Sequence, residues 1–528
     1  MQASSIPRAQ SPGEAGISAG AVAALAEDVI GQGLNLHSFM VIRNGLVAYE
    51  DFRKPYGPDD PHAMYSVSKS VTSIAVGFAV EEGRLRLEDK VADLLPELRE
   101  YDKSENLEKL LVFHLITMSA GKRLGLTVDR TRKQWIQDFG EGIWDYAPGE
   151  GWHYCNENIY LLCAILTRVC GECVTDYLMP RLFEPLDIPR PFWEHDGHGV
   201  EVGGWGLYLR TEEMAKIAMC FLDEGRFRGR RIIPAAWARE CGRAQADNSA
   251  NDEVLVHGCN GYGYCFWLNA MPGSFRMDGM FSQFAMILPE YNALVVTTGG
   301  EPNMQAMQDT LWRHIPAMLE AREGDEEAVI PKLPAYEPLA EAPRFAALEA
   351  KIEGRSIRFP DSVQRLPRAL GFPVSMMSSV IFFMSADKAG GIDRASFRFG
   401  EDSLKFSWSE GRERNTILCG MDGRARKCRV TLGGVEFVVA CSAAWEGDKL
   451  LLRVRNVNSV ASRELVFRFD GRAVRMQPHS DPSLEMLVRD VARTVEKAIS
   501  NKTLASLAAG MMGQMPLMAE PLHVGYLQ

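Results

Sequence analysis

Several features that would assign this chain to a class at once are missing from its sequence. No run of about 18 apolar residues occurs, so no membrane-spanning helix is predicted. Positive charge is not in excess, because the chain has 58 Lys and Arg but 69 Asp and Glu, which gives a formal net charge of −11. That balance argues against nucleic acid or an anionic membrane as a partner. The N-terminus lacks a basic start followed by an apolar core, and we therefore expect a cytoplasmic protein.

Signatures of metal sites and disulfide frameworks are also missing. The 11 cysteines are an odd number spread through apolar surroundings, which is typical of reduced thiols. Cys170 and Cys173 have the CxxC spacing of a redox or metal site, but no second CxxC or His pair lies at zinc-finger spacing. We therefore interpret these two cysteines as helix-end thiols, and we predict neither a metal nor a cofactor.

The length and composition are those of a multidomain globular protein. A chain of 528 residues predicts two or three domains, and 46% hydrophobic with 24% charged residues is typical of packed cores under a charged surface. A proline-rich stretch at 331–338 marks a linker, which we place at 330–345. The interpretation is one domain at 1–329 and a smaller accessory domain at 346–528.

Hydrophobic periodicity predicts a mixed first domain. A helix is expected at 21–30, and Asn44-Gly45 between two strand-like runs at 36–42 and 46–52 is a strong hairpin signal. The middle of the domain is mainly helical. Strands are expected again near its end, at 262–268, 275–278, 282–288 and 293–298, followed by a helix at 303–320. These positions predict one antiparallel sheet assembled from distant pieces and flanked by helices.

The accessory domain alternates as short strands, which predicts a small β-barrel or β-sandwich. The expected strands lie at 378–384, 395–399, 404–408, 435–440, 449–454 and 464–469. Two helices, at 484–499 and 504–511, and a tail rich in Met and Pro are expected to finish it. No second set of nucleophile and base is found there, so we expect this domain to pack on the first and to shape the entrance of its cleft.

The stretch around Ser66 carries the strongest chemical signal. Ser66 and Lys69 stand three residues apart directly before a helical apolar pattern at 71–80, so both side chains project from the first turn of a mostly buried helix. A serine hydroxyl is a poor nucleophile at neutral pH, and an adjacent amine activates it only if its surroundings hold that amine near neutrality. Two further Ser-x-x-Lys spacings, at 119–122 and 385–388, lie in turns and do not open an apolar helix.

A second polar pair follows in the stretch 148–158. Tyr154 and Asn156 lie two positions apart on a tight loop that enters a helical pattern at 159–169. A phenol can exchange protons there, and an amide can anchor an ammonium or a substrate carbonyl. Considered alone, however, this stretch is more typical of an ordinary polar helix start capped by Asn156 or Asn158.

With these motifs in order, residues from about 10 to 325 resemble the serine β-lactamase-like family, in the branch of class C β-lactamases, penicillin-binding proteins and family VIII esterases. The matching motifs are Ser66 and Lys69 before an apolar helix, the helix and turn at 113–121, Pro148-Gly149 before Tyr154 and Asn156, the glycine turn at 203–207, the aromatic run at 262–267, and Gly279 with Gln283 before 288–290. The resemblance implies an α+β fold, with an antiparallel sheet flanked by helices and a helical subdomain. The C-terminal β-rich domain looks like an appendage found on some members.

The resemblance also implies roles for individual residues. Ser66 would form an acyl-enzyme, Lys69 and Tyr154 would share the proton transfers, and Asn156 would orient Lys69 and the substrate. Which of Lys69 and Tyr154 takes the serine proton stays open. The backbone N–H groups of Ser66 and Met280 are implied as the oxyanion hole, which stabilises the charge that develops during acylation. A water would then deacylate the enzyme.

The third motif departs from the family's better-known members. Where those carry Lys or His, then Thr or Ser, then Gly, this chain has Met277, Asp278 and Gly279. The missing groups grip a substrate carboxylate, so β-lactam and D-alanyl-D-alanine substrates are not expected. Strand alternation is expected to point Arg276 away from the side of Met277, so that it does not restore the cation. Asp278 is either a turn residue or an acceptor for a substrate ammonium.

These residues predict a metal-independent serine hydrolase, an esterase or amidase acting on a small ester or amide. Candidates for the substrate pocket are Trp152, Tyr262, Tyr264, Trp267 and Gln283, although core packing explains the aromatic ones equally well. One alternative is a peptidase for D-residues or short peptides. Another is a catalytically silent member that binds a ligand or partner. A homo-oligomer stays open.

Overall fold

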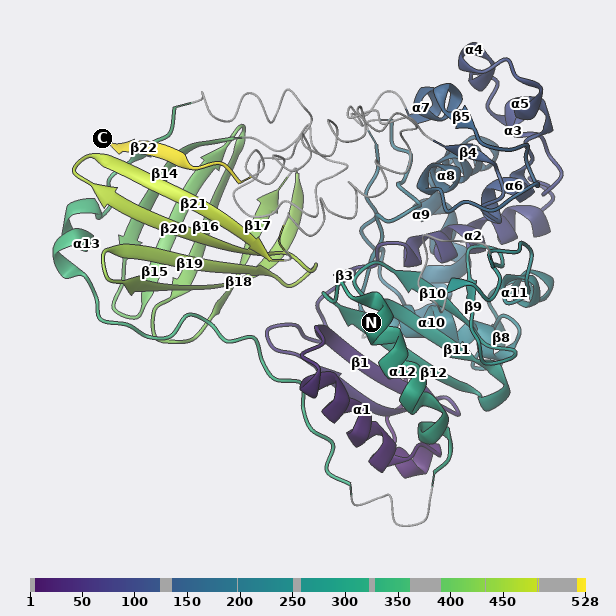
Figure 1. Cartoon of the computed structure of the whole chain (residues 1–528), viewed down its shortest axis with the longest axis horizontal. Coiled ribbons are helices and arrows are strands. Elements are labelled where there is room, and N and C mark those ends of the chain that lie inside the picture. Colours follow the sequence, from purple (N-terminus) through teal and green to yellow (C-terminus); the bar gives the residue numbers. More distant parts are fainter. Residues whose placement is uncertain are drawn as a thin grey trace. The chain divides into compact units, whose positions relative to one another are not determined.

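The computed structural model divides the chain into two compact units, of which the first ends at Ala335 and the second begins at Tyr336 (Figure 1). The structure describes residues 5–123, 135–196, 198–249, 258–321, 328–360, 391–432, 434–481, 483 and 520–528. Within those ranges no single helix has the length and hydropathy of a membrane span, and the helix Asn156–Cys170 with the segment Val174–Leu186 passes that test only as a pair bent by 70°.

The first unit is organised around a six-stranded sheet in which every neighbouring pair runs antiparallel. Its order is β2 (Leu46–Phe52), β1 (Leu36–Arg43), β12 (Ala293–Gly299), β11 (Gln283–Leu288), β10 (Phe275–Gly279) and β9 (Trp267–Leu268). The predicted sheet built from both ends of the domain is therefore confirmed. The chain returns from a long helical excursion to place β12 directly beside β1.

One predicted strand is shorter than expected. The run at 262–268 contains only β9, because the backbone turns before it at Cys265, whose φ is 61°. A side chain at Gly263 would lie 2.0 Å from the carbonyl oxygen of Cys241, so this segment follows a close backbone contact instead of extending the sheet. Beyond β9, the end of β10 therefore lies at the edge of the sheet.

Helices cover both faces of the sheet (Figure 1). On one face, α1 (Ala19–Gly31) and α12 (Met304–Leu319) bury alternate residues of the strands in a core that includes Val22, Phe39 and Leu311. Both helices begin at a polar cap that binds a free backbone N–H, Ser18 for α1 and Asn303 for α12. On the other face, α2 (Val67–Glu81) contacts β10, and α10 (Thr211–Met219) contacts β11 and β12.

A helical subdomain lies between β2 and β9 in the sequence. Its helices are α3 (Val91–Leu94), α4 (Leu98–Tyr101), α5 (Glu105–Lys109), α6 (Val112–Ile116), α7 (Trp135–Glu141), α8 (Asn156–Cys170), α9 (Val174–Leu178) and α11 (Ala235–Cys241). Three short strand pairs accompany them: β3 (His62–Ala63) with β6 (Tyr208–Leu209), β4 (Lys122–Arg123) with β5 (Ile143–Trp144), and β7 (Arg226–Phe227) with β8 (Arg230–Arg231). Because α8 packs against α2, it brings its first turn close to the start of α2.

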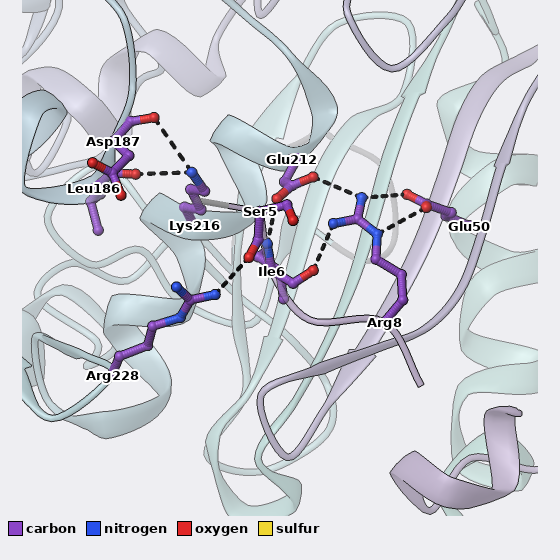
Figure 2. Close-up of polar contacts among 9 residues, drawn as sticks. All are labelled: Ser5, Ile6, Arg8, Glu50, Leu186, Asp187, Glu212, Lys216 and Arg228. Atoms are coloured by element: carbon purple, nitrogen blue, oxygen red, sulfur yellow. Dashed lines mark hydrogen bonds and ion pairs between the residues drawn. The ribbon is translucent and has the colours of Figure 1, made fainter. Parts of the chain in front are cut away.

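The N-terminal segment is held to the sheet edge by a charged cluster (Figure 2). The Arg8 guanidinium donates to both oxygens of Glu50 on β2 at 3.0 Å and to Glu212 on α10 at 2.7 Å. The other oxygen of Glu212 accepts from the backbone N–H of the fully buried Ile6 at 2.6 Å. Arg8 also forms a parallel bridge with Val47. The segment therefore adds to the outer edge of β2 and ties that strand to α10.

The second unit is a single ten-stranded sheet that closes on itself as a barrel, since Gly420 of one edge pairs with Ser442 near the other. Its strand order is β16 (Glu413–Gly420), β15 (Ser403–Glu410), β14 (Ile392–Phe399), β13 (Ile357–Arg358), β22 (His523–Leu527), β21 (Ala473–Asp481), β20 (Ser462–Asp470), β19 (Lys449–Asn456), β18 (Val435–Glu446) and β17 (Arg426–Leu432). Helix α13 (Ala346–Ile352) precedes it. Inside, Phe397 packs against Phe406 and Phe467 at centroid distances of 5.2 and 5.0 Å.

The barrel confirms one of the two predicted architectures and corrects the expected end of the domain. Strands β13, β16, β17, β21 and β22 were not predicted, and the last of them follows the Met- and Pro-rich tail that was expected to close the domain. The predicted strand at 378–384 and the predicted helices at 484–499 and 504–511 lie outside the described residues.

Candidate active site

Ser66 stands immediately before the first turn of α2, as predicted. It occupies the N-cap position but makes no side-chain cap, so its hydroxyl remains available to other groups. The residue before it, Tyr65, has a left-handed φ of 46°, a conformation that side-chain-bearing residues seldom adopt and that recurs at functional sites. The sharp turn leaves Ser66 partly exposed while Lys69, one turn into the helix, is only 1% exposed.

The Lys69 amine connects three parts of the fold. Its Nζ lies 2.8 Å from Ser66 Oγ, 2.7 Å from Asn156 Oδ1 at the start of α8, and 2.5 Å from the carbonyl oxygen of Gly204. Gly204 belongs to the glycine turn at 203–207, and its neighbour Gly203 has no room for a side chain, since a Cβ would lie 2.4 Å from Cys163 Sγ. The sequence motifs at 66–69, 156 and 203–207 therefore meet at one nitrogen.

Burial lowers the pKa of Lys69 to about 7. In its neutral form the amine has two hydrogens and one lone pair. The Asn156 and Gly204 oxygens can only accept, so they take the two hydrogens. The lone pair is then left for Ser66, which donates its hydroxyl hydrogen. The geometry thus fits a neutral lysine that accepts a proton from Ser66.

Tyr154 is the third polar group at this point. Its hydroxyl hydrogen-bonds Ser66, and Lys69 Nζ lies 4.8 Å from the centroid of its ring. Burial raises the pKa of this phenol far above its usual value, and nearby Asp278 raises it further. Tyr154 is therefore a protonated phenol at neutral pH. The expectation that Asn156 or Asn158 caps α8 is wrong, because the N-cap position belongs to Cys155 and Asn156 points its amide oxygen to Lys69.

The third motif lies on the last residues of β10. Met277 is fully buried, and a side chain at Gly279 would lie 2.4 Å from the carbonyl oxygen of Met64, two residues before Ser66. Only a glycine allows the strand to approach the turn before Ser66 this closely. The motif therefore reaches the site through the backbone, and the Met277 side chain adds no positive charge.

Arg276 and Asp278 form an ion pair that was not predicted. Arg276 Nε donates to Asp278 Oδ2 at 2.8 Å, and Arg276 Nη1 donates to Asn269 Oδ1 at 2.8 Å. Residues two apart on a strand share a face, so the alternation that points Arg276 away from Met277 also brings it to Asp278. The interpretation of Asp278 as a turn residue is wrong, because it belongs to β10. The role of Asp278 as an acceptor for a substrate ammonium stays a prediction. The carboxylate that would bind the ammonium is already paired with Arg276.

A tight turn after β10 carries Met280, which is 51% exposed. Phe281 and Ser282 both have left-handed φ angles, of 64° and 72°. Gln283 holds this turn: its Nε2 donates to the carbonyl oxygens of Met280, Phe281 and Gly299 at 2.9, 3.1 and 2.8 Å. Gln283 is fully buried, so the structure places it beneath the turn. The roles of Met280 and Gly279 in an oxyanion hole stay predictions.

Aromatic rings surround Tyr154. Trp267 stacks on it with a centroid distance of 5.5 Å, and Trp152 and Tyr262 contact Trp267 at 5.6 and 5.0 Å. The rings of Trp152, Tyr262 and Trp267 are called the aromatic wall below. Trp152, Tyr262 and Trp267 were all candidates for the substrate pocket, and the structure brings these three together. Tyr264 lies elsewhere, packed against Trp237 with a centroid distance of 4.7 Å.

The second Ser-x-x-Lys spacing has a different geometry. Lys122 Nζ donates to Asp102 Oδ2 at 2.5 Å and to the carbonyl oxygen of Gly140 at 2.7 Å, and both side chains are buried. The Ser119 hydroxyl instead bonds that of Thr117 at 2.9 Å. Lys122 is therefore a buried ion-pair partner. The third such spacing, at 385–388, lies outside the described residues.

The predicted helix-end thiols lie where expected, Cys170 at the end of α8 and Cys173 at the N-cap of α9. The Cys173 thiol donates to Asp176 Oδ2 at 3.2 Å. In the part of the chain that the structure describes, no group of three or more His, Cys, Asp or Glu side chains has the arrangement of a metal site.

A family model described as Beta-lactamase matches residues 22–314, which include every group of this site. The chain belongs to the beta-lactamase family. It is 26% identical over 235 residues to the 6-aminohexanoate-dimer hydrolase of Paenarthrobacter ureafaciens, a match that covers 41% of this chain and 59% of that protein. It is 24% identical over 189 residues to Protein flp of Staphylococcus aureus, covering 32% of this chain and 38% of that protein. The chain thus spans less than two thirds of the length of both relatives.

Solved structures are also similar to part of this chain. A family VIII carboxylesterase superposes with a TM-score of 0.43 at 16% identity, covering 58% of this chain and 98% of that one. The penicillin binding protein from Bacillus halodurans superposes with a TM-score of 0.43 at 14% identity, covering 54% of this chain and 97% of that one. One of the relatives matched by sequence, the 6-aminohexanoate-dimer hydrolase, carries a hydrolase name.

Proposed function

We propose that this chain is a serine hydrolase that cleaves a small ester or amide through a covalent acyl-enzyme on Ser66. The observation that carries the proposal is the buried Lys69 amine, whose two hydrogens are taken by Asn156 and Gly204 and whose lone pair faces Ser66 Oγ. A silent ligand-binding member has no need for an amine held near neutrality against a serine hydroxyl. The arrangement therefore supports an enzyme over a binding protein.

Acylation in this proposal begins with proton transfer from Ser66 to Lys69. Ser66 Oγ attacks the substrate carbonyl carbon, and fixed backbone donors stabilise the oxyanion that forms. Tyr154 passes its phenol proton to the leaving oxygen or nitrogen, and the proton on Lys69 restores it. A water molecule then attacks the acyl-enzyme. Lys69 is the base because its lone pair is available at neutral pH, whereas the phenol of Tyr154 is protonated.

The surroundings support an uncharged substrate. The position that grips a carboxylate in related enzymes is the buried Met277, and the nearest arginine, Arg276, is paired with Asp278. Within the aromatic wall, Trp267 stacks on Tyr154, and the partly exposed Trp152 lies beside the same ring at a centroid distance of 6.3 Å, so the phenol has apolar neighbours. Neutral esters and amides with apolar acyl groups fit these features better than carboxylates. A peptidase for short peptides is less well supported, because the Asp278 carboxylate that would receive their ammonium group already has a partner.

Covalent labelling tests the proposal directly. Intact mass spectrometry after treatment with a fluorophosphonate should show one adduct on the wild type and none on Ser66→Ala, with hydrolysis of p-nitrophenyl acetate and butyrate lost in parallel. Ser119→Ala is the matched control, since Ser119 belongs to the other described Ser-x-x-Lys spacing, and it should label like the wild type. A folded wild type that takes no label, or a Ser66→Ala variant that still does, would refute the assignment.

A further inference from the structure

Side chains rather than a backbone ladder join β16 to β17 in the described part of the barrel. The Asn415 side chain donates to the carbonyl oxygen of Thr431 and accepts from its N–H, both at 2.8 Å. Three residues along each strand, the Cys428 thiol lies between the backbone groups of Leu418, accepting from its N–H at 3.1 Å and donating to its carbonyl oxygen at 3.5 Å. The side chains of Asn415 and Cys428 thus substitute for the backbone hydrogen bonds that usually join neighbouring strands.

Two hydrogen-bond donors at the Cys428 sulfur favour a reactive thiol. The Leu418 N–H points at its sulfur, and the Cys441 thiol on the neighbouring strand β18 donates a hydrogen bond to it. Cys428 pairs with Val439, so Cys441 lies one diagonal position away on the same inner face. Cys428 is partly exposed, whereas Cys441 is fully buried. The two hydrogen bonds lower the pKa of Cys428 to about 6.

The other cysteines provide a contrast. Burial raises the pKa of the thiols at Cys155, Cys163, Cys170, Cys173, Cys220, Cys241 and Cys265. Cys170 and Cys173 have the spacing of a redox motif, yet Cys173 donates to a carboxylate, an arrangement that disfavours its thiolate. The chemical setting of a reactive cysteine is therefore in the barrel and not at the CxxC spacing.

We propose that Cys428 is a site of oxidation by hydrogen peroxide and that Cys441 resolves it to a disulfide across β17 and β18. In the first step the Cys428 thiolate attacks one peroxide oxygen, so that an S–O bond forms and the O–O bond breaks. Hydroxide leaves and takes a proton to become water. The sulfur is oxidised by two electrons, and the peroxide is reduced.

In the second step Cys441 loses its proton and attacks the Cys428 sulfur. The S–S bond forms, the S–O bond breaks, and the departing hydroxide takes that proton to become a second water. The net reaction is two thiols and one peroxide to one disulfide and two waters. The resulting link joins strands that already pair through their backbones, one residue from the Gly420–Ser442 bridge that closes the barrel.

Two measurements on the full chain test the inference. Limited treatment with hydrogen peroxide should lower the intact mass by about 2 Da, reversibly with a dithiol, and peptide mapping should place the new disulfide between Cys428 and Cys441. Separately, brief labelling of the untreated protein with iodoacetamide at neutral pH should modify Cys428 at least about tenfold faster than Cys173. The labelling experiment needs no variant, so it remains decisive if a barrel variant does not fold.

Three variants sharpen the result. Cys428→Ser should abolish the mass loss, and Cys441→Ser should instead trap a sulfenic acid on Cys428 that reacts with dimedone. Cys173→Ser is the matched control and should behave like the wild type. A disulfide mapped to Cys170 and Cys173, or labelling of Cys428 only after denaturation, would overturn the proposal. Turnover of p-nitrophenyl esters reports on Ser66 separately, so the hydrolase proposal and this one fail independently.

Discussion

The pH dependence of acylation provides the sharpest test of the mechanism, because it follows from the protonation of a single amine. Burial lowers the pKa of Lys69 to about 7, against about 10.4 for an ordinary lysine. With a pKa of 7, about a tenth of the amine is neutral at pH 6 and about nine tenths at pH 8. We therefore expect the acylation rate to rise about tenfold between these pH values and then to level off.

Other charges near Lys69 determine how far this midpoint can move. Glu157 and Asp278 act to raise its pKa by their negative charge. Cys155 and Cys265 also face it, but burial raises the pKa of both thiols, to about 12 for Cys265, so they carry no charge near neutral pH. Removing one anion in Glu157→Gln should therefore shift the midpoint to lower pH while leaving the plateau rate close to that of the wild type.

The assay is the pseudo-first-order rate of fluorophosphonate labelling of Ser66 between about pH 5.5 and 9.5, a range that brackets a midpoint near pH 7 and stays below the pKa of an ordinary lysine. Thermal unfolding measured at each pH identifies any loss of folded protein. A lysine with its ordinary pKa would give an increase of about a hundredfold from pH 6 to 8 and no plateau. Such a profile, or one without any pH dependence, would refute the assignment of neutral Lys69 as the base.

Four further outcomes are expected. Tyr154→Phe should slow acylation by about two to four orders of magnitude with little effect on substrate binding, measured by separating kcat from KM. Nitrocefin turnover should be negligible, because Met277 cannot bind its carboxylate; efficient turnover would show that another cation substitutes. Gln283→Leu should lower the free energy of unfolding by about 2–4 kcal/mol, measured by urea denaturation, because the carbonyls of the third-motif turn lose their buried donor. Lys122→Met should cost about 3–5 kcal/mol by leaving Asp102 buried without its partner, yet the labelling rate of the folded fraction should not change.

Local patterns were sufficient to predict most of the first domain. The hairpin around Asn44-Gly45 and the helix after Ser66 were predicted nearly to their ends, because turn chemistry and apolar periodicity are local properties. The run at 262–268 shows the limit of such patterns. Its aromatic composition is typical of a strand, but the contact between Gly263 and Cys241 depends on tertiary structure and breaks the strand. In the barrel, β16 and β17 escaped prediction because both begin with charged residues and the inward position of Asn415 is polar, which shortens the apolar alternation.

The candidate site was predictable in its composition but not in its electrostatics. The spacing of Ser66, Lys69, Tyr154 and Asn156 indicated which groups would meet. The sequence left open which group is the base, because that depends on burial and on the number of acceptors around Lys69. The sequence also left open whether Asp278 is a turn residue or an acceptor for a substrate ammonium. Its contact with Arg276, two residues away on β10, depends on the packing of the folded sheet.

The loss of the third-motif cation and the assignment of Lys69 as base are physically connected. A cation at position 277 would favour the phenolate of Tyr154 and would allow it to take the serine proton. With Met277 there and Asp278 nearby, the surroundings of Tyr154 favour the neutral phenol instead. The proton of Ser66 then needs another acceptor, and the buried amine at 2.8 Å is the group that can take it near pH 7. The proposed substrate without a carboxylate and the proposed lysine base are thus two consequences of the same difference at position 277.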